Sequence, residues 1–234
     1  MIESQVAIVT AAGRGMGAAI ARELKSRGYQ LALISPSGAA EKLAQELSGV
    51  GLNGSVSDPD DLYQLIELTM KTYGRVDAVI NHTGHPPKGE LLHISDEDWA
   101  RGLDMLLLNV VRMSRLVTPI MVSSGGGAIV NISTFAAFEP EEKFSVSACI
   151  RAGLSSFTKL YADKYAQDGI RMNCILPGFI DSLPKKEENL TRIPMGRYGT
   201  VHEISKAAAF LLSDNASYIT GQSIRVDGGI TRHV

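Results

Sequence analysis

The chain has 234 residues, of which 44% are hydrophobic and 21% are charged, a composition typical of a single globular domain with a sizeable core. Its 23 basic and 25 acidic residues leave a net charge of −2, which gives no electrostatic reason to expect nucleic acid or a membrane surface as a partner. No uninterrupted apolar run approaches the ~18 residues of a membrane span, and the N-terminus does not resemble a signal peptide, so we expect a cytoplasmic protein.

Strand and helix patterns alternate along the whole chain. We expect strands near residues 5–10, 30–35, 51–56, 76–81, 127–133, 170–176 and 222–227. We expect helices near residues 16–27, 39–48, 59–73, 96–121, 144–168 and 201–213. Alternation with short connections predicts right-handed crossovers and a parallel sheet covered on both faces. The fold class is therefore α/β, a doubly wound parallel sheet of about seven strands in one domain, residues 1–234.

The first strand and helix enclose a glycine-rich turn, within QVAIVTAAGRGMGAAI at residues 5–20. Glycines at 13, 15 and 17 let the backbone turn sharply and approach a pyrophosphate, which then lies against free N–H groups of the next helix. The spacing Gly13-x-Gly15-x-x-Ala18 also fits the fingerprint of dinucleotide-binding proteins. A glycine turn without a nucleotide is the alternative, and the strand and helix around it favour a dinucleotide.

The residues after the second strand indicate which dinucleotide is preferred. An acid about twenty residues beyond the glycines normally binds the ribose 2′-hydroxyl of NAD. Position 35 is Ser, and residues 33–37 contain no carboxylate. Arg14, inside the turn, would attract a 2′-phosphate, to which Ser35 and Ser37 can donate hydrogen bonds. We therefore predict NADP(H) rather than NAD(H), with a surface role for Arg14 as the alternative.

Two further features bear on the site. The one long irregular segment, residues 179–199, is polar and follows a strand, which predicts a lid over a binding site. Cys149 and Cys174 lie in apolar stretches, which predicts buried free thiols in a reducing compartment. No cluster of His, Cys and acidic residues has the spacing of metal ligands, so we expect no metal.

Five motifs in chain order resemble those of the short-chain dehydrogenase/reductase family over nearly the whole chain. Residues 10–17 resemble its TGxxxGxG turn, residues 81–84 its NNAG motif, residues 127–134 the strand before its catalytic serine, residues 170–178 its IRVN…PG motif and residues 219–229 its ITGQ…VDGG motif. In the first motif Ala11 replaces the first glycine. The resemblance implies a Rossmann fold, a nicotinamide cofactor and a small-molecule substrate.

The catalytic positions depart from the family pattern. In the family, a Tyr lies thirteen residues beyond the serine and a Lys four residues further. Counting from Thr134 gives Ser147 and Arg151, and residues 151–154 match the KAGL sequence that normally follows. The family's Asn falls on Leu106, with Asn109 one turn away. The resemblance thus implies a rebuilt catalytic set in which Thr134, Ser147 and Arg151 are the catalytic candidates.

These replacements change the proton chemistry. Tyrosine has a pKa near 10, which a neighbouring cation can lower enough for acid catalysis. A serine hydroxyl is several units weaker as an acid, and Arg151 stays charged and cannot relay a proton. Arg151 can still hold ribose hydroxyls, and Thr134 or Ser133 can donate one hydrogen bond to a substrate oxygen.

Substitute proton donors are few. His82 and His85 follow the fourth strand. We expect His82 to be a structural histidine that fills the NNAG corner, whereas His85 either faces the site or is a solvated loop histidine. The glutamates at 139, 141 and 142 lie between Thr134 and Ser147, and they are expected to form a solvated run unless one of them faces the cleft.

The cofactor contacts implied by the resemblance come from the glycine turn, the ends of the second and fourth strands, the catalytic helix and the segment after the sixth strand. We predict Gly13, Arg14, Gly15, Met16, Gly17, Ser35, Asn81, Gly84, Arg151, Pro177, Gly178 and Ile180.

Three functions from different classes are compatible with these residues. The leading one is an NADP(H)-dependent oxidoreductase acting on a small carbonyl or imine substrate through an atypical catalytic site. The alternative is a catalytically weak cofactor-binding protein, or pseudoenzyme, of the same fold. Halohydrin dehalogenases share the fold and an Arg at the Lys position, but they keep the Tyr and lose the glycine turn, whereas this chain does the reverse.

The resemblance also implies a homotetramer. The helices 96–121 and 144–168 would pair across one interface, and the C-terminal strand across another. Apolar residues on the two helices exceed what one sheet face needs. They are Leu103, Leu107, Val110, Leu154, Phe157 and Leu160.

Overall fold

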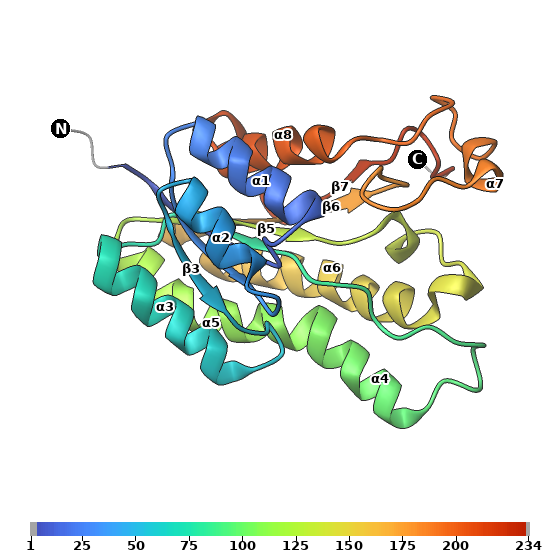
Figure 1. Ribbon diagram of the computed structural model, residues 1–234, viewed down its shortest axis with the longest axis horizontal. Helices are drawn as coiled ribbons and strands as arrows, with labels where there is room; N and C mark the ends of the chain where they lie inside the picture. Colours follow the sequence, from blue (N-terminus) through green and yellow to red (C-terminus); the bar gives the residue numbers. More distant parts are fainter. Residues whose placement is uncertain (1–3, 233–234) are drawn as a thin grey trace.

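The computed structural model describes residues 4–232, which form one sheet of seven strands with helices on both faces (Figure 1). The strands are β1 (Val6–Thr10), β2 (Gln30–Ser35), β3 (Val50–Asn53), β4 (Ala78–Asn81), β5 (Gly127–Ile132), β6 (Ile170–Pro177) and β7 (Ser223–Val226). The helices are α1 (Gly15–Ser26), α2 (Ala39–Glu46), α3 (Pro59–Tyr73), α4 (Asp96–Leu103), α5 (Asn109–Ser123), α6 (Ser145–Tyr165), α7 (Glu187–Leu190) and α8 (Val201–Leu212).

The strand order is β3-β2-β1-β4-β5-β6-β7, and every neighbouring pair is parallel. β1 pairs with β2 on one side and β4 on the other, so the order reverses between β1 and β4. In open α/β sheets, ligands bind beyond the carboxyl ends of the strands at such a reversal. The doubly wound sheet of seven strands in a single domain confirms the fold predicted from the sequence.

The two faces of the sheet are covered by different helices (Figure 1). Along β1, Ala7 and Val9 pack into a core shared with α1, α2 and α8. Ile8 points to the opposite face and packs with α3, α5 and α6. Because side chains alternate along a strand, a strand buried on both faces needs apolar residues at successive positions, which is the pattern seen at residues 6–9.

The helix expected at residues 96–121 is divided by a π-helical segment, Asp104–Leu108, between α4 and α5. The whole helical stretch Asp96–Ser123 is long and apolar enough to cross a membrane by length and composition, which the search for uninterrupted apolar runs did not single out. In this fold, however, Met113, Val117 and Met121 are buried against the sheet. The stretch is therefore used as a core helix of an α/β domain.

The two cysteines are both free thiols within the described residues, and they differ in burial. Cys174 on β6 is buried as predicted, but Cys149 on α6 is exposed, so the prediction of a buried thiol is wrong there. The apolar stretch around Cys149 belongs to a helix with one face in solvent.

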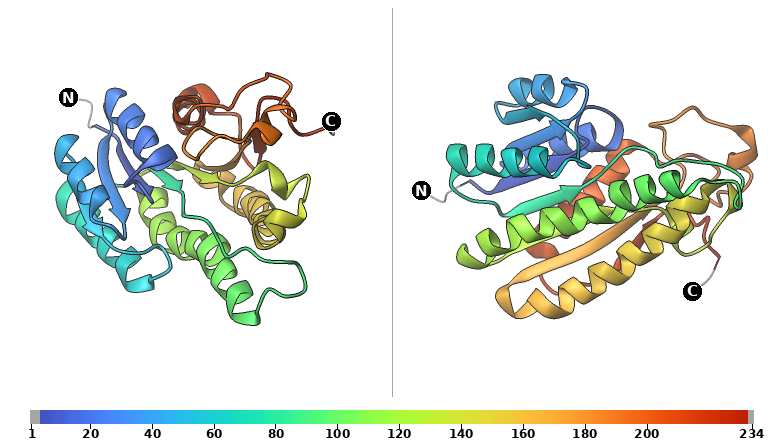
Figure 2. Two further views of the ribbon diagram at one scale, coloured as in Figure 1. Left: turned by 45° about the vertical axis from the view of Figure 1, so that its right-hand side comes forward. Right: turned by 90° about the horizontal axis from the view of Figure 1, so that it is seen from below.

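The carboxyl ends of β4, β5 and β6 carry the longest connections (Figure 2). One runs from residue 82 to 95, another from 133 to 144 and the third from 178 to 200. The third connection contains the short helix α7, which the sequence did not predict. These connections and the glycine turn after β1 lie at one end of the sheet, because parallel strands all end on the same side.

Candidate cofactor and active site

The glycine turn joins β1 to α1 with very little room around its glycines. A side chain at Gly17 would collide with the main-chain carbonyl of Ala11. A Cβ at Gly13 would lie 2.8 Å from Ser35 Oγ. The glycines at 13 and 17 are therefore needed for the close packing of turn, helix and second strand, a role that was not predicted from the sequence.

The space around Gly15 is less crowded than that around Gly13 and Gly17. Its φ is +55°, a left-handed conformation that favours glycine, and the nearest atom to an added Cβ is Ser182 Cβ at 3.4 Å. The turn thus leaves a narrow cradle between the start of α1 and residue 182 that a side chain would fill. The first N–H groups of α1 carry no acidic side chain in their turn, so the cradle fits the pyrophosphate of a dinucleotide.

Ala11 also has a left-handed backbone, with φ at +48°. The resemblance to the family places a glycine at this position, and the backbone keeps the conformation that glycine favours. A left-handed alanine costs roughly 1 kcal/mol. Local strain of this kind persists where the surrounding structure holds it.

The residues predicted to select the cofactor lie at this turn. Arg14 is exposed and precedes the first residue of α1. Ser35 is buried, faces Gly13 and accepts a hydrogen bond from the Ala40 N–H at 3.1 Å. Its hydroxyl is thus partly engaged, whereas Ser37 is exposed. Arg14 and Ser37 are the more accessible groups for a 2′-phosphate.

Thr10 joins the glycine turn to the residues after β4. Its hydroxyl donates to the His82 carbonyl at 2.6 Å and accepts from the His82 N–H at 2.8 Å. Next to it, the Asn81 side chain donates to Asn131 Oδ1 at 2.9 Å, and Asn131 donates to Thr158 Oγ1 at 3.0 Å. Asn81 thus supports the central strands beside the predicted cofactor position, with its side chain buried.

The structure brings Thr134, Ser147 and Arg151 to the end of β5. Ser147 lies in the first turn of α6, and Arg151 lies one turn later on the same face of that helix. The Arg151 guanidinium is buried and donates to the main-chain carbonyl of Ile132. Thr134 follows two residues later, partly exposed, and its Oγ1 accepts from the Ala136 N–H at 3.4 Å.

Arg151 has no carboxylate partner within residues 4–232. Burial lowers its pKa to about 10, which still leaves the guanidinium charged at neutral pH. A buried charge without a counterion is costly. The arrangement therefore favours an anionic or strongly polar ligand beside Arg151.

Leu106 occupies the position of the family's Asn, and its surroundings are apolar as well. Leu106 lies within the π-helical segment, is buried, and packs against Val146 and Ile150 of α6. Asn109 is also buried, and its Oδ1 accepts from the Val110 N–H at 2.6 Å. π-helical turns are frequent at functional sites, but here the turn presents a leucine.

The two candidate histidines differ. His82 is partly exposed, yet its Nδ1 is shielded from solvent and has no hydrogen-bond partner. Burial, followed by Arg151 and His85, lowers the pKa of His82 to about 3, so it is neutral at pH 7. His85 is more exposed, and partial burial followed by Lys88, Arg151 and Arg14 lowers its pKa as well.

Ser133 is a second orphaned group at this site. Its Oγ is buried and has no hydrogen-bond partner among residues 4–232, while its N–H donates to the Ile175 carbonyl at 2.8 Å. From the sequence, Ser133 was only the alternative to Thr134 as hydrogen-bond donor to a substrate oxygen. The structure makes Ser133 the hydroxyl that lacks a partner and Thr134 the one that caps a turn.

The glutamates after Thr134 are not a simple solvated run. Glu141 forms an ion pair with Arg192 and another with Lys143 at 3.1 Å. These cations hold the pKa of Glu141 below its ordinary value against the opposing effect of burial. Glu139 accepts from the Arg232 N–H. Glu141 is thus ionised at neutral pH and is a poor proton donor.

The segment predicted as a lid begins where β6 ends at Pro177. The Gly178 N–H donates to Val226 at 3.1 Å, and Ile180 is buried and bridges to Gly199. Farther along, the Tyr198 hydroxyl accepts from the Lys186 N–H at 2.9 Å and from Asn189 at 3.0 Å. The segment is internally bonded, and residue 182 lies beside the glycine turn.

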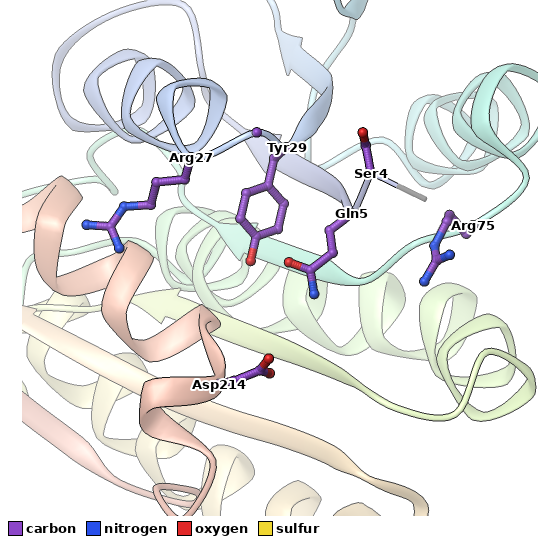
Figure 3. Close-up of a pocket in the computed structure, with 7 residues that line it drawn as sticks. Ser4, Gln5, Arg27, Tyr29, Arg75 and Asp214 are labelled. Atoms are coloured by element: carbon purple, nitrogen blue, oxygen red, sulfur yellow. The ribbon is translucent and has the colours of Figure 1, made fainter. Parts of the chain in front are cut away.

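A cavity of about 680 Å³ lies elsewhere, where β1 and β2 begin (Figure 3). Tyr29, Gln5 and Asp214 line it together with two arginines. Both arginines already have partners: Arg27 pairs with Glu23 at 2.7 Å and Arg75 with Asp77 at 2.7 Å. It lies at the end of the sheet opposite to the glycine turn, so we do not assign it to the cofactor.

Comparisons with known proteins agree with this geometry. Residues 10–231 match the family described as enoyl-(acyl carrier protein) reductase. The chain is 32% identical to 3-oxoacyl-(acyl-carrier-protein) reductase FabG of Thermotoga maritima, covering 98% of both chains. It is 34% identical to FabG of Escherichia coli K12, covering 97% of this chain and 98% of the relative. The crystal structure of YwfH, an NADPH-dependent reductase involved in bacilysin biosynthesis, superposes with a TM-score of 0.93 at 26% identity, covering 99% of this chain and 100% of that one.

Proposed function

Because the chain belongs to the short-chain dehydrogenase/reductase family, we propose that it is an NADPH-dependent reductase of a small carbonyl or imine substrate. The catalytic positions of the family are rebuilt here around Thr134, Ser147 and Arg151. The observation that carries the proposal is the glycine cradle at the end of β1 combined with the buried, uncompensated guanidinium of Arg151 at the end of β5.

The preference for NADPH rests on charge at the turn. Arg14 is exposed beside the cradle, and Ser35 stands where an acid would bind the ribose of NAD. A 2′-phosphate gains a charge-assisted hydrogen bond from an arginine and loses affinity beside a carboxylate. The description of YwfH as NADPH-dependent supports the same choice.

When bound, NADPH supplies the hydride. Arg151 provides a fixed positive charge and hydrogen-bond donors for the cofactor's ribose hydroxyls, and its burial strengthens that field because the surroundings are poorly polarisable. Ser133 or Thr134 donates one hydrogen bond to the oxygen of a carbonyl substrate, or accepts one from the N–H of a protonated imine. Ser147 lies one helical turn from Arg151, at the position from which the family's Tyr delivers a proton.

The weak acidity of Ser147 limits the substrates. Positioned acid catalysis typically contributes ~10²–10⁴-fold, and neither neutral His82 nor ionised Glu141 replaces it. A cationic iminium accepts hydride to give a neutral amine, so no alkoxide develops and no strong acid is needed. We infer that strongly polarised carbonyls, and protonated imines whose charge is balanced by an anionic group of the same molecule, are reduced efficiently and that unactivated ketones are reduced slowly.

The experiment that tests the function is saturation binding of NADPH followed by turnover. The protein would first be titrated with NADPH, then supplied with saturating NADPH and a panel of cyclic iminium ions, activated keto compounds and simple ketones. The proposal expects binding and oxidation of NADPH with the first two classes. Saturable binding without turnover across the panel would instead favour the pseudoenzyme alternative.

We further propose that the reductase is cytoplasmic and assembles as a homotetramer. Leu103 and Leu160 remain exposed on α4 and α6, whereas Val110 and Leu154 are buried in the protomer. The exposed pair is available for an interface between copies.

A further inference from the structure

Three connections lie beyond the active-site end of the sheet (Figure 2). Contacts between cations and aromatic rings join them. Lys88 Nζ, after β4, lies 5.7 Å from the centre of the Phe144 ring, after β5. Lys143 Nζ lies 5.3 Å from the same ring and 5.6 Å from the Phe179 ring, after β6. Arg192 lies 5.4 Å from the Phe179 ring. We call these residues, Lys88, Lys143, Phe144, Phe179 and Arg192, the cation–ring cluster.

Two of the three cations in the cluster have a counterion. Glu141 pairs with both Arg192 and Lys143. One carboxylate therefore serves two cations and joins the second connection to the third. The role of these ion pairs in joining the two connections is enough to explain Arg192 and Lys143.

Lys88 is not explained in this way. Its ammonium group is exposed and makes no ion pair or hydrogen bond within residues 4–232. The acid nearest to it in the chain, Glu90, is paired with His93 at 2.5 Å. Lys88 is therefore a cation over a half-buried ring without a counterion.

Between Lys88 and the proposed active site, several positive charges act on the same histidine. The charged groups that act on His85 are Lys88, Arg151 and Arg14, and all of them lower its pKa. Helix α6 begins immediately after Phe144 with no acidic residue in its first turn, so the positive end of its dipole adds to this field, partly offset by Glu142 in the short 3-10 turn before it. An anion near Lys88 would meet attraction from each of these sources.

We propose that the substrate is an organic acid, held with its anionic group at Lys88 and its apolar part against the rings of Phe144 and Phe179. This inference rests on the proposed function and assigns its substrate class. Phe144 lies three residues before Ser147 and one residue before α6, so a ligand on this ring lies next to the proposed catalytic positions. Lys88 is then a specificity-determining residue, since it binds the acid group and leaves the reacting carbonyl or imine to Thr134 and Ser147.

Benzoylformate and its methyl ester are suitable probes. Both carry the same activated ketone on the same ring, and the ester is at least as electrophilic, so any preference for the acid comes from its charge. Binding of each probe would be measured by calorimetry on the protein with and without saturating NADP⁺. Turnover of each probe would be measured separately with NADPH.

We expect the acid to bind about tenfold more tightly than the ester, a difference of about 1.4 kcal/mol. Lys88→Met keeps an apolar chain on the Phe144 ring and removes the charge, so it should reduce the preference severalfold by weakening binding of the acid and leaving binding of the ester unchanged. Raising the ionic strength from about 0.02 to 0.2 M should weaken binding of the acid more in the wild type than in Lys88→Met. Lys206→Met, an exposed lysine on α8, is the matched control and should keep the preference.

Equal binding of acid and ester by the wild type would overturn the inference, as would an equal loss for both probes in Lys88→Met. Binding decides this inference, and turnover decides the proposed function. Reduction of the ester without preferential binding of the acid would refute the proposed substrate class but not the proposed reductase activity. Preferential binding of the acid without reduction of either probe would support the anion site at Lys88 and count against the reductase.

Discussion

Arg151 of α6 donates a hydrogen bond to the main-chain carbonyl of Ile132, the last residue of β5. The bond holds a buried guanidinium at the carboxyl end of a central strand, directly before Ser133 and Thr134. A lysine in this place would deliver a more mobile charge with fewer donors. The fixed charge of Arg151 and the weak acidity of Ser147 together define the chemistry proposed for this site.

The cofactor preference depends on Arg14. We expect Arg14→Ala to weaken NADPH binding by at least tenfold and to leave NADH binding within twofold, because a hydrogen bond between charged groups contributes about 1.5–3 kcal/mol. Titration calorimetry with both nucleotides measures this directly. Arg22→Ala, which removes an exposed α1 arginine paired with Glu46, is the control. Equal affinities of the wild type for NADPH and NADH would refute the preference.

The left-handed alanine makes a prediction about stability. Ala11→Gly should relieve backbone strain of roughly 1 kcal/mol, partly offset by the greater freedom of glycine in the unfolded chain. Thermal unfolding should therefore show an increase in Tm of up to about 2–4 °C. Ala12→Gly is the matched control, since Ala12 is fully buried and lacks a positive φ, and it should lower Tm. A decrease for Ala11→Gly as large as that for Ala12→Gly would contradict the strain.

His82 predicts how stability changes with pH. Its pKa is about 3 in the folded protein and about 6.5 in an unfolded chain. Between these values the unfolded chain binds more protons, so stability is full above about pH 6.5 and falls as the pH drops toward 3. We expect the wild type to lose about 1–2 kcal/mol between pH 7 and pH 5 from this group.

The variant His82→Asn removes that titration and places the family's own residue at the position. Free energies of unfolding in urea at pH 7 and pH 5 should therefore differ less for His82→Asn than for the wild type. His202→Asn, at an exposed position on α8, should behave like the wild type. Parallel pH profiles for His82→Asn and the wild type would show that the Nδ1 environment does not disfavour the charged form.

Assembly can be tested at Leu160, whose side chain on α6 is 69% exposed. Light scattering at micromolar concentration should give the mass of a tetramer for the wild type and a smaller assembly for Leu160→Glu, because a buried carboxylate disrupts an apolar interface. Leu92→Glu, at an exposed position in the connection before α4, should remain tetrameric. A monomeric wild type would refute the homotetramer.

Much of the fold could be predicted because its signals are local. The glycine turn at 13–17 and the successive apolar residues of β1 carry their structural meaning in residue type and order. Boundaries were less accurate: the strand expected at residues 51–56 is Val50–Asn53, and the one expected at 76–81 is Ala78–Asn81. These ends depend on pairing with neighbouring strands, which residue patterns do not contain.

The electrostatic part of the site could not be predicted, because it depends on contacts between distant segments. Glu141 resembles a member of a solvated acidic run until Arg192, fifty-one residues later, is placed against it. The left-handed φ of Ala11 had one signal, the glycine that the family motif has at this position, because alanine itself seldom adopts this conformation. That neither Arg151 nor Lys88 forms an ion pair within the described part of the chain, residues 4–232, follows only from the folded arrangement.

The most direct test of the rebuilt site is the kcat for an unactivated ketone with saturating NADPH, measured for the wild type and for the double variant Ser147→Tyr with Arg151→Lys. The account predicts that the wild type is well below ~10 s⁻¹, an ordinary enzyme value, and that the double variant is faster because it restores a tyrosine acid beside a lysine. A wild-type kcat of ~10 s⁻¹ with that ketone would contradict the account, because it would require a strong proton donor that Ser147 and Arg151 do not provide.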